Sequence, residues 1–343
     1  DSLGVAVAVQ LFPRAMPFVT LDLKMDRAAA LERADELART HGWGPEDRRL
    51  AAGLMSSDTV QSYIELEGGG NEAFARMLGE DLYRPFTWDV RLFQEHQANE
   101  TLVRFTPEGE PYGFRETLAE DAPGAALGEE QARRIAEAAA VEAWGVDLSD
   151  FAPLEASQEV RPGGRVDHTL VYERVGAEHR MGEERYRLRL VVSGDRFTEL
   201  VHFVKVPEAF ERRFAEMRSK NELVSALSNG TVFVLYGAGA IIGLFLLLRI
   251  RWVVWRPAVP WAGAVALGIS AALLSQWPLD WMRYDTAVSA AGFGAQLVIY
   301  AILNGLFMGI VALVAMVAGE SLGRRAFPHH PQLWKLWTPD AAR

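Results

Sequence analysis

Three long apolar windows without Asp, Glu, Lys, Arg or His occupy the last third of the chain. They lie between Glu222 and Arg249, between Arg256 and Asp280, and between Asp285 and Glu320. Each exceeds the roughly 20 apolar residues that a helix needs to cross the hydrocarbon core of a bilayer. The pattern predicts an all-α membrane domain over residues 223–320, with three transmembrane helices at about 228–248, 257–279 and 295–318. Because the third window is longer than one span requires, residues 286–294 are predicted to be an interfacial lead-in.

The earlier part of the chain alternates between helical and strand periodicity. One helix is predicted between Asp26, a favourable N-cap, and Gly42, and a second from about Glu129 to Trp144, ended by Gly145. Alternating apolar residues predict strands, the last two joined by a turn at 193–195. These strands are Val19–Met25, Val60–Leu66, Phe86–Leu92, Leu102–Phe105, Thr169–Val175, Tyr186–Val192 and Phe197–Val206.

The order of these elements suggests a duplication. Gly42 and Gly145, which each follow a helix, are 103 residues apart, and Phe86 and Tyr186, which each start a strand, are 100 apart. Matching order at a matching offset is typical of repeated units. We therefore predict an α+β soluble domain made of two helix-plus-antiparallel-sheet repeats, at 15–115 and 116–207.

Three further segments complete the predicted organisation. Residues 1–14 are apolar but too short to span, which favours the end of a membrane helix that begins before this chain, or else a buried strand. Residues 208–222 form a charged connector helix, acting either as a coupling helix at the membrane surface or as a plain connector with a half-buried face. Residues 321–343 form a tail.

The charge of the chain is unevenly distributed. The whole sequence has 35 Lys and Arg against 45 Asp and Glu, and the excess of acids lies in the part before the apolar windows. An acidic domain repels phosphate backbones, so nucleic acid is not an expected partner. The sequence contains no Cys, which excludes disulfides, Cys-ligated zinc and thiol nucleophiles.

Basic residues indicate an orientation in the membrane. The loop after the first window holds Arg249, Arg251 and Arg256 without an acid, and the tail holds further basic residues. The positive-inside rule then places this loop and the tail in the cytoplasm and the soluble domain outside a cell (inner) membrane. Basic residues of the connector argue the other way, namely Arg212, Arg213, Arg218 and Lys220.

Small and polar residues supply few candidates for function. Gly239 with Gly243, and Gly305 with Gly309, have the small-xxx-small spacing that lets membrane helices pack closely, although such spacing also arises by chance. Asp167-His168 is either a local acid–base pair or an ordinary strand start, and His329-His330 is either a metal or head-group contact or a turn of the tail.

Several phrases resemble one known group of proteins. They are Phe12-Pro-Arg-Ala ahead of Leu21-Asp-Leu-Lys-Met-Asp-Arg, Val206-Pro-Glu-Ala-Phe with Met217-Arg-Ser-Lys-Asn-Glu, and Gly319-Glu-Ser-Leu-Gly-Arg-Arg-Ala-Phe-Pro with Leu333-Trp-Lys-Leu-Trp. Together they resemble the amino-terminal part of long bacterial members of the CPBP family, the CAAX-prenyl-endopeptidase-like intramembrane proteases. The resemblance implies an extracytoplasmic insert between an early span and a helical bundle.

The catalytic motifs of that family are not found in this chain. The family uses Glu-Glu-x-x-x-Arg, Phe-x-x-x-His and His-x-x-x-Asn to activate a water in the membrane. The match at Glu129-Glu130 with Arg134 begins a soluble helix, where acids favour the positive helix end. Glu320 and Arg324 carry half of the first motif and are weak catalytic candidates. The resemblance places the catalytic half, with a possible metal or glutamate-activated water, beyond Arg343, and no cofactor is expected in this chain.

The predicted repeats also resemble PepSY-like modules, which are associated with protease inhibition or regulation. The leading hypothesis is the membrane-embedded portion of a CPBP-type protease, whose soluble domain binds or regulates through a peptide or protein ligand. The alternative is a non-enzymatic, membrane-anchored sensor or inhibitor with tandem PepSY-like domains. A transporter is disfavoured because the three windows contain no charge at mid-membrane depth.

Overall fold

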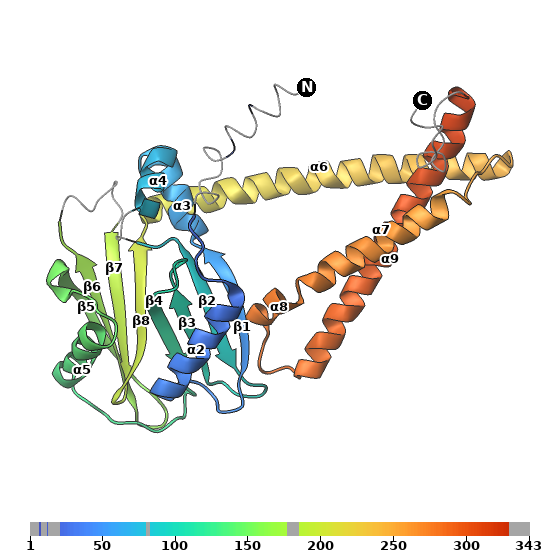
Figure 1. Ribbon diagram of the computed structural model, residues 1–343. Coiled ribbons are helices and arrows are strands. Elements are labelled where there is room, and N and C mark those ends of the chain that lie inside the picture. Colours follow the sequence, from blue (N-terminus) through green and yellow to red (C-terminus); the bar gives the residue numbers. More distant parts are fainter. Residues whose placement is uncertain (1–6, 8–11, 13–20, 80–82, 177–184, 329–343) are drawn as a thin grey trace. The chain divides into compact units, whose positions relative to one another are not determined.

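The computed structural model of the protein describes residues 7, 12, 21–79, 83–176 and 185–328. The chain forms two compact units (Figure 1). The first unit contains the residues before Phe214 together with Trp281–Ser289, and the second contains Phe214–Asp280 and the residues from Ala290 onward. The predictions for residues 1–14 and for His329-His330 lie outside the described residues, apart from the isolated positions 7 and 12.

The first unit is built on one eight-stranded antiparallel sheet with the strand order β1-β2-β3-β4-β8-β7-β6-β5. Within the described residues, β1 and β5 form its two edges, and the two sets of four strands meet where β4 pairs with β8. Each set is a meander that follows one helix in the sequence. The strands are β1 (Arg49–Ser56), β2 (Phe86–Phe93), β3 (Glu100–Phe105), β4 (Pro111–Thr117), β5 (Phe151–Val160), β6 (Val166–Arg174), β7 (Arg185–Ser193) and β8 (Arg196–Lys205).

Helices α2 (Arg27–His41) and α5 (Glu129–Glu142) cover the same face of the sheet (Figure 1). Both helices bury alanines spaced four residues apart, a spacing that places them on one side of a helix. With no side chain beyond Cβ, these residues let each helix lie close to the strands. The buried alanines are Ala30, Ala34 and Ala38 in α2 and Ala132, Ala136 and Ala140 in α5, and all are inaccessible to solvent.

The join between β4 and β8 is tight at both backbone and side-chain level. A Cβ on Gly113 would lie 2.5 Å from the carbonyl oxygen of Leu200, so only glycine fits opposite that strand. Next to it, Phe114 pairs with Leu200 in the ladder. The ring of Phe114 stacks with Trp43 and with Trp144 at centroid distances of 4.3 and 5.1 Å, and the two tryptophan rings also stack on each other at 6.2 Å. Aromatic rings that follow the two helices therefore meet on the central strand.

Two of the predicted strands are wrong. Residues 60–66 belong to helix α3 (Asp58–Leu66), which with α4 (Gly70–Gly79) lies between β1 and β2. Val60 and Ile64 fit both the strand period of two residues and the helical period of about 3.6 residues. Tyr63 is buried with them, and its position fits the helical period only. Residues 21–26 contain no strand, and this segment is held instead by hydrogen bonds of Met25 to Pro107 and Trp88.

The structure also contains three strands that the apolar pattern did not indicate. The middle of β1 is Ala51-Ala52-Gly53, β4 begins at Pro111, and β5 is an exposed edge strand with a bulge after Pro153. The proposed match of Phe86 with Tyr186 is wrong in detail. Phe86 starts the second strand of its set, whereas Tyr186 lies in the third strand of the other.

Three helices are long and apolar enough to cross a membrane: α6 (Glu208–Arg249), α7 (Ala258–Ser275) and α9 (Ala290–Ala326). They indicate a membrane-associated protein. The connector predicted at 208–222 and the first span form one continuous helix, and Phe210 is the buried apolar residue of the connector part. Helix α9 begins at Ala290, about five residues before the predicted start of the third span, and the interfacial position of residues 286–294 stays a prediction. Short helices at Trp277–Asp280 (α8) and Trp281–Arg283 (η4) follow α7.

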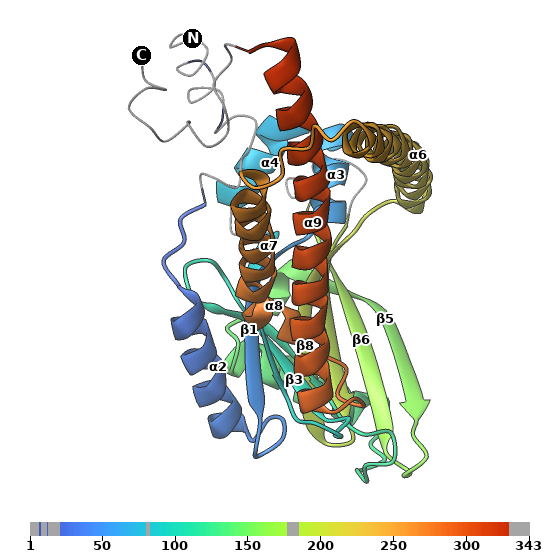
Figure 2. The same ribbon diagram turned by 90° about the vertical axis from the view of Figure 1, so that its right-hand side faces the viewer.

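Helices α7 and α9 pack side by side (Figure 2). A Cβ on Gly305 would lie 2.5 Å from the carbonyl oxygen of Ala266, and one on Gly309 would lie 2.8 Å from the Ala266 side chain. The hydroxyl of Ser270 donates a hydrogen bond to the carbonyl of Ala301 at 3.1 Å. The two glycines of α9 therefore lie where α7 approaches most closely.

We expect Gly113→Ala to destabilise the sheet by about 1–3 kcal/mol, because the added methyl meets a carbonyl that cannot move without opening the β4–β8 pair. Gly128→Ala is the matched control, since a Cβ there has no neighbour within 4 Å. Amide hydrogen exchange of β4 and β8 in the full chain measures the difference. Equal exchange in the two variants would contradict the assigned role of Gly113.

Candidate functional site

The face of the sheet opposite α2 and α5 is lined with ion pairs. Because side chains alternate along a strand, the charged residues of neighbouring strands meet on this open face. Three pairs across adjacent strands have donor–acceptor distances between 2.8 and 3.2 Å. These pairs are Arg104 with Asp89, Arg187 with Glu173, and Arg115 with Glu199, which also accepts a bond from Arg189.

A polar cleft of about 500 Å³ opens on this face over β6, β7 and β8. One wall comes from the end of β4 and the other from the edge strand β5. This cleft, hereafter the polar cleft, lies beside the join of the two strand sets. Its main lining residues are Arg115, Glu159, Arg161, Asp167, Ser193 and Glu199.

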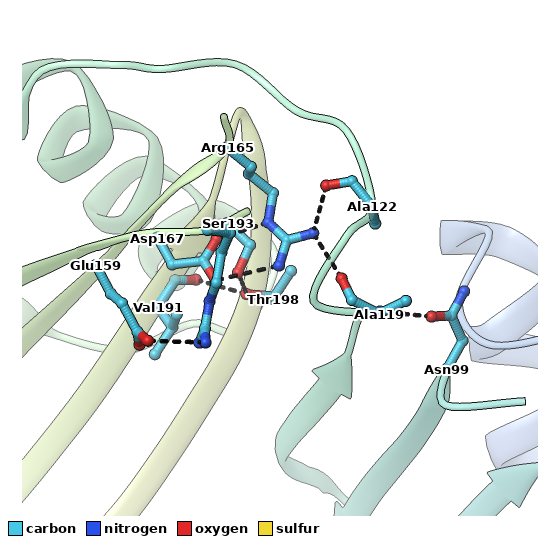
Figure 3. A network of polar contacts seen from close by, with 10 residues as sticks. Asn99, Ala119, Ala122, Glu159, Arg165, Asp167, Val191, Ser193 and Thr198 are labelled. Atoms are coloured by element: carbon cyan, nitrogen blue, oxygen red, sulfur yellow. Dashed lines mark hydrogen bonds and ion pairs between the residues drawn. The ribbon is translucent and has the colours of Figure 1, made fainter. Parts of the chain in front are cut away.

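Arg165 and Asp167 line one part of the polar cleft and belong to one network of polar contacts (Figure 3). Arg165 is 2% exposed, and its Nε donates to Asp167 at 2.8 Å. Its Nη1 donates to the carbonyls of Ala119 and Ala122 at 3.1 and 3.0 Å. One buried guanidinium therefore fixes the segment between the two strand sets onto the start of β6. Such a buried charge is stable only while its partner remains ionised.

Two of the buried carboxylates, Asp167 and Glu116, have pKa values shifted in opposite directions. Burial raises the pKa of Asp167, but hydrogen bonds from Arg165 and Arg161 outweigh it and hold that pKa below the usual range. Burial raises the pKa of Glu116, with Arg196 at 3.0 Å opposing the shift. Since each carboxylate is bonded to an arginine, we interpret both as structural groups rather than as an acid and a base.

The rim of the polar cleft is accessible and carries both signs of charge. The side chains of Arg115 and Glu159 are 43% and 65% exposed, and Arg161 bridges Glu159 and Asp167. In the cleft, the hydroxyls of Ser193 and Thr198 lie 3.0 Å apart. Within the described part of the chain, no group of three or more His, Asp or Glu residues has the placement of a metal site. The arrangement suits recognition of a polar ligand with charges of both signs.

A second feature of the open face is the segment Trp281–Ser289, hereafter the docked loop. It begins with η4 and connects α8 to α9. Tyr284 is 1% exposed, and its ring centroid lies 5.4 Å from that of Phe93 on β2. The guanidinium of Arg49 on β1 lies 5.0 Å from the Trp281 ring centroid, a cation–π contact. The docked loop therefore buries aromatic surface on the edge of the sheet.

Hydrogen bonds to the backbone fix the docked loop in register. Nη1 of Arg91 donates to the carbonyl of Tyr284 at 2.6 Å, while its Nε donates to Glu100 at 2.9 Å. The amide of His96 donates to the carbonyl of Thr286 at 2.7 Å. Because α7 and α9 flank this segment in the chain, these hydrogen bonds attach the connection between two candidate spans to β2 and the loop that follows it.

The residues singled out from the sequence are dispersed. Nε of Arg324 donates to Glu320 at 2.8 Å, an i,i+4 pair within α9. Gly305 and Gly309 contact α7, whereas a Cβ on Gly239 or Gly243 would meet no described atom within 4 Å. A packing role for Gly239 and Gly243 stays a prediction.

The interpretation of Asp167-His168 as an acid–base pair is wrong. Neighbouring residues of a strand face opposite sides of the sheet, so Asp167 joins the polar cleft while His168 enters the core side. Nε2 of His168 lies 2.8 Å from the carbonyl oxygen of Leu127, and the residue is 1% exposed.

Comparison of the chain with protein-family models, with curated proteins and with solved structures finds no match.

We expect Asp167→Asn to destabilise the first unit by about 3–5 kcal/mol, because it leaves the buried charge of Arg165 without a counter-ion. Glu159→Gln is the control, since this exposed acid also pairs with an arginine and should change stability by under about 1 kcal/mol. Hydrogen exchange of β6 amides in the full chain reports both effects. A small effect in both variants would show that the pair is dispensable.

The ion pair of Arg165 with Asp167 makes the stability of the first unit depend on pH. The folded-state pKa of Asp167 is lowered, so its contribution to stability is present above the unfolded-state value of about 4. That contribution is lost as the pH falls through the folded-state pKa. The Asp167→Asn variant should therefore lose less stability than the natural chain between about pH 5 and the acid limit, as measured by acid unfolding.

We expect Arg91→Gln to increase hydrogen exchange in the docked loop by about ten-fold or more, because charge-assisted bonds of this kind contribute about 1.5–3 kcal/mol. Arg104→Gln is the matched control, since Arg104 is paired on the same face but with Asp89. Protection of 281–289 should survive in that variant. Loss of protection in both would mean that general sheet charge, rather than Arg91, holds the loop.

Proposed function

We propose that this chain is the membrane-embedded portion of a CPBP-type intramembrane protease, in which the sheet domain is a binding and regulatory module. The observation that carries the proposal is the docked loop. It places the connection between two apolar helices on the sheet that also carries the polar cleft. A ligand of the sheet domain is thereby able to influence the membrane helices through protein contacts alone.

The ligand class follows from the groups at the rim of the polar cleft. We propose a peptide segment of a protein, with a carboxylate that pairs with Arg115 and an amine that pairs with Glu159. Arg115 lies on β4 and pairs with Glu199 across the join of the two strand sets. A ligand carboxylate that replaces Glu199 as the partner of Arg115 removes this ion pair between β4 and β8. Strand β4 pairs with β3, which pairs with β2, and β2 holds the docked loop.

The sheet domain also supports the proposed relation to tandem PepSY-like modules. A helix followed by four antiparallel strands occurs twice, with α3 and α4 inserted in the first set. This order is the basis of the proposal, and likeness of fold alone does not establish activity. The proposed association is with regulation of a protease.

The proposed orientation places the sheet domain outside the cell and the turn after α6 in the cytoplasm. Its basis is the arginine-rich turn at 249–256. If α6 and α7 each cross once, the chain returns to its starting side before the docked loop. Packing of that loop on the sheet is in keeping with two crossings. The multi-pass arrangement in the inner membrane belongs to the same proposal.

Catalysis is proposed to reside beyond Arg343. Glu320 and Arg324 pair with one another within a single helix, and neither is joined by the further motifs of the family. The alternative function is a membrane-anchored sensor or inhibitor without enzymatic activity. The ion pairs of Asp167 with Arg165 and of Glu116 with Arg196 favour binding over acid–base chemistry in the polar cleft.

The decisive experiment compares this chain with a longer form that continues past Arg343, each reconstituted in nanodiscs with a library of quenched fluorescent peptides. We expect cleavage by the longer form and none by this chain. In the longer form, Arg115→Gln should weaken the apparent affinity for regulated substrates by about ten-fold, the loss of one charged hydrogen bond. Arg187→Gln, which alters a pair outside the cleft, is the matched control.

The outcomes separate the two functions. Cleavage by the short chain that Glu320→Ala abolishes would overturn the proposal that the catalytic half lies elsewhere. A reading frame that ends at Arg343, with peptide binding but no cleavage, would establish the sensor or inhibitor instead. Equal effects of Arg115→Gln and Arg187→Gln would remove the polar cleft from either function.

A further inference from the structure

An apolar groove of about 500 Å³ lies in the second unit, between the end of α6 and the facing part of α9. Its walls are aliphatic, and the turn that follows α6 forms its mouth. The wall residues are Leu244, Leu248, Leu313, Val314 and Val317, and the mouth is formed by Arg251, Val253 and Trp255. Trp255 is 58% exposed, as expected for a tryptophan at the level of lipid head groups.

Arg251 lines this mouth, and further arginines lie in the adjoining segments. The turn after α6 contains Arg249, Arg251 and Arg256, and α9 ends with Arg324 and Arg325. The two segments are in contact, because the amide of Val254 donates to the hydroxyl of Ser321 at 3.0 Å. The guanidinium of Arg325 also lies 3.3 Å from the ring centroid of Trp252. Both sets of arginines are thus at the same end of the helices.

Acidic groups do not balance this charge. The sequence has no acid between Glu222 and Asp280, and Glu320 is the single acid between Asp285 and the arginines that end α9. Glu320 is paired with Arg324. The mouth of the groove therefore carries a strong net positive charge beside an apolar cavity, which is complementary to an anion attached to a hydrocarbon chain.

The backbone conformation at Arg251 is a second observation, independent of charge, that indicates a role for this side chain. Arg251 has a φ of +56°, the left-handed conformation that favours glycine at the end of a helix. The amide of Trp252 donates to the carbonyl of Leu247 at 3.0 Å, and that of Arg251 to Leu248 at 3.1 Å, the two bonds of a Schellman motif. An arginine thus occupies a position where glycine is less strained.

We propose that this groove binds an anionic phospholipid. One acyl chain lies between α6 and α9 against the aliphatic walls, and the head-group phosphate is held by Arg251 with the neighbouring arginines of the turn. Guanidinium groups recognise phosphate oxygens through paired hydrogen bonds, and basic sites between membrane helices suit anionic head groups. The site is independent of the function proposed for the sheet domain.

The test is a titration of the full chain in detergent with phosphatidylglycerol, read by native mass spectrometry, with phosphatidylcholine as the neutral comparison. We expect one phosphatidylglycerol to bind at least ten-fold more tightly than phosphatidylcholine. Arg251→Gly should abolish this preference while leaving the helix end less strained, so the variant stays folded. Arg212→Gln removes one positive charge at the other end of α6 and should leave the preference intact.

A second variant tests the acyl chain. Val314→Trp fills the groove without altering any charge and should weaken phosphatidylglycerol binding by at least ten-fold. Glycerol 3-phosphate, the head group without acyl chains, should not compete at millimolar concentration. Equal binding of the two lipids, or full competition by glycerol 3-phosphate, would overturn the proposal. An unchanged preference in Arg251→Gly would overturn the assigned role of this residue.

Discussion

The sheet domain depends on the close approach of β4 and β8. Without it the chain would contain two four-stranded meanders, each with one helix and two exposed edges, and neither would bury much apolar surface alone. Gly113 permits the backbones to meet, and the stacked rings around Phe114 then join the cores beneath α2 and α5. The polar cleft is a product of the same join, because its walls come from both strand sets.

The open face of the sheet achieves order through charge rather than apolar burial. Exposed pairs such as Arg161 with Glu159 contribute little stability individually, but they restrict the side chains that form them. At the edge formed by β1 and β2 this ordered charge is used differently. Arg91 is shared between a carboxylate and the backbone of the docked loop, so one side chain connects strand pairing with the segment between two apolar helices.

Local signals in the sequence predicted the elements that local chemistry determines. Asp26 and Gly42 cap α2 as expected, the turn at Gly194 joins β7 to β8, and each apolar window overlaps one of the three candidate spans. The strands β1 and β5 were missed because an edge strand of small or exposed residues carries no apolar alternation. The sites were beyond reach for another reason: Arg115 and Glu199 are 84 residues apart, and Arg91 and Tyr284 are 193 apart. Such pairs become neighbours only through long-range strand pairing and chain reversal.

The outer strand β5 has a consequence for behaviour in a crowded membrane. A protein confined to a bilayer meets its own copies at high effective concentration, and an unpaired strand is a template for edge-to-edge aggregation. β5 carries Pro153, a bulge in the adjoining residues, and the outward acids Glu155 and Glu159. Each of these features disfavours pairing with the edge of another sheet, so the domain carries an edge strand beside the polar cleft with little tendency to pair with neighbouring copies.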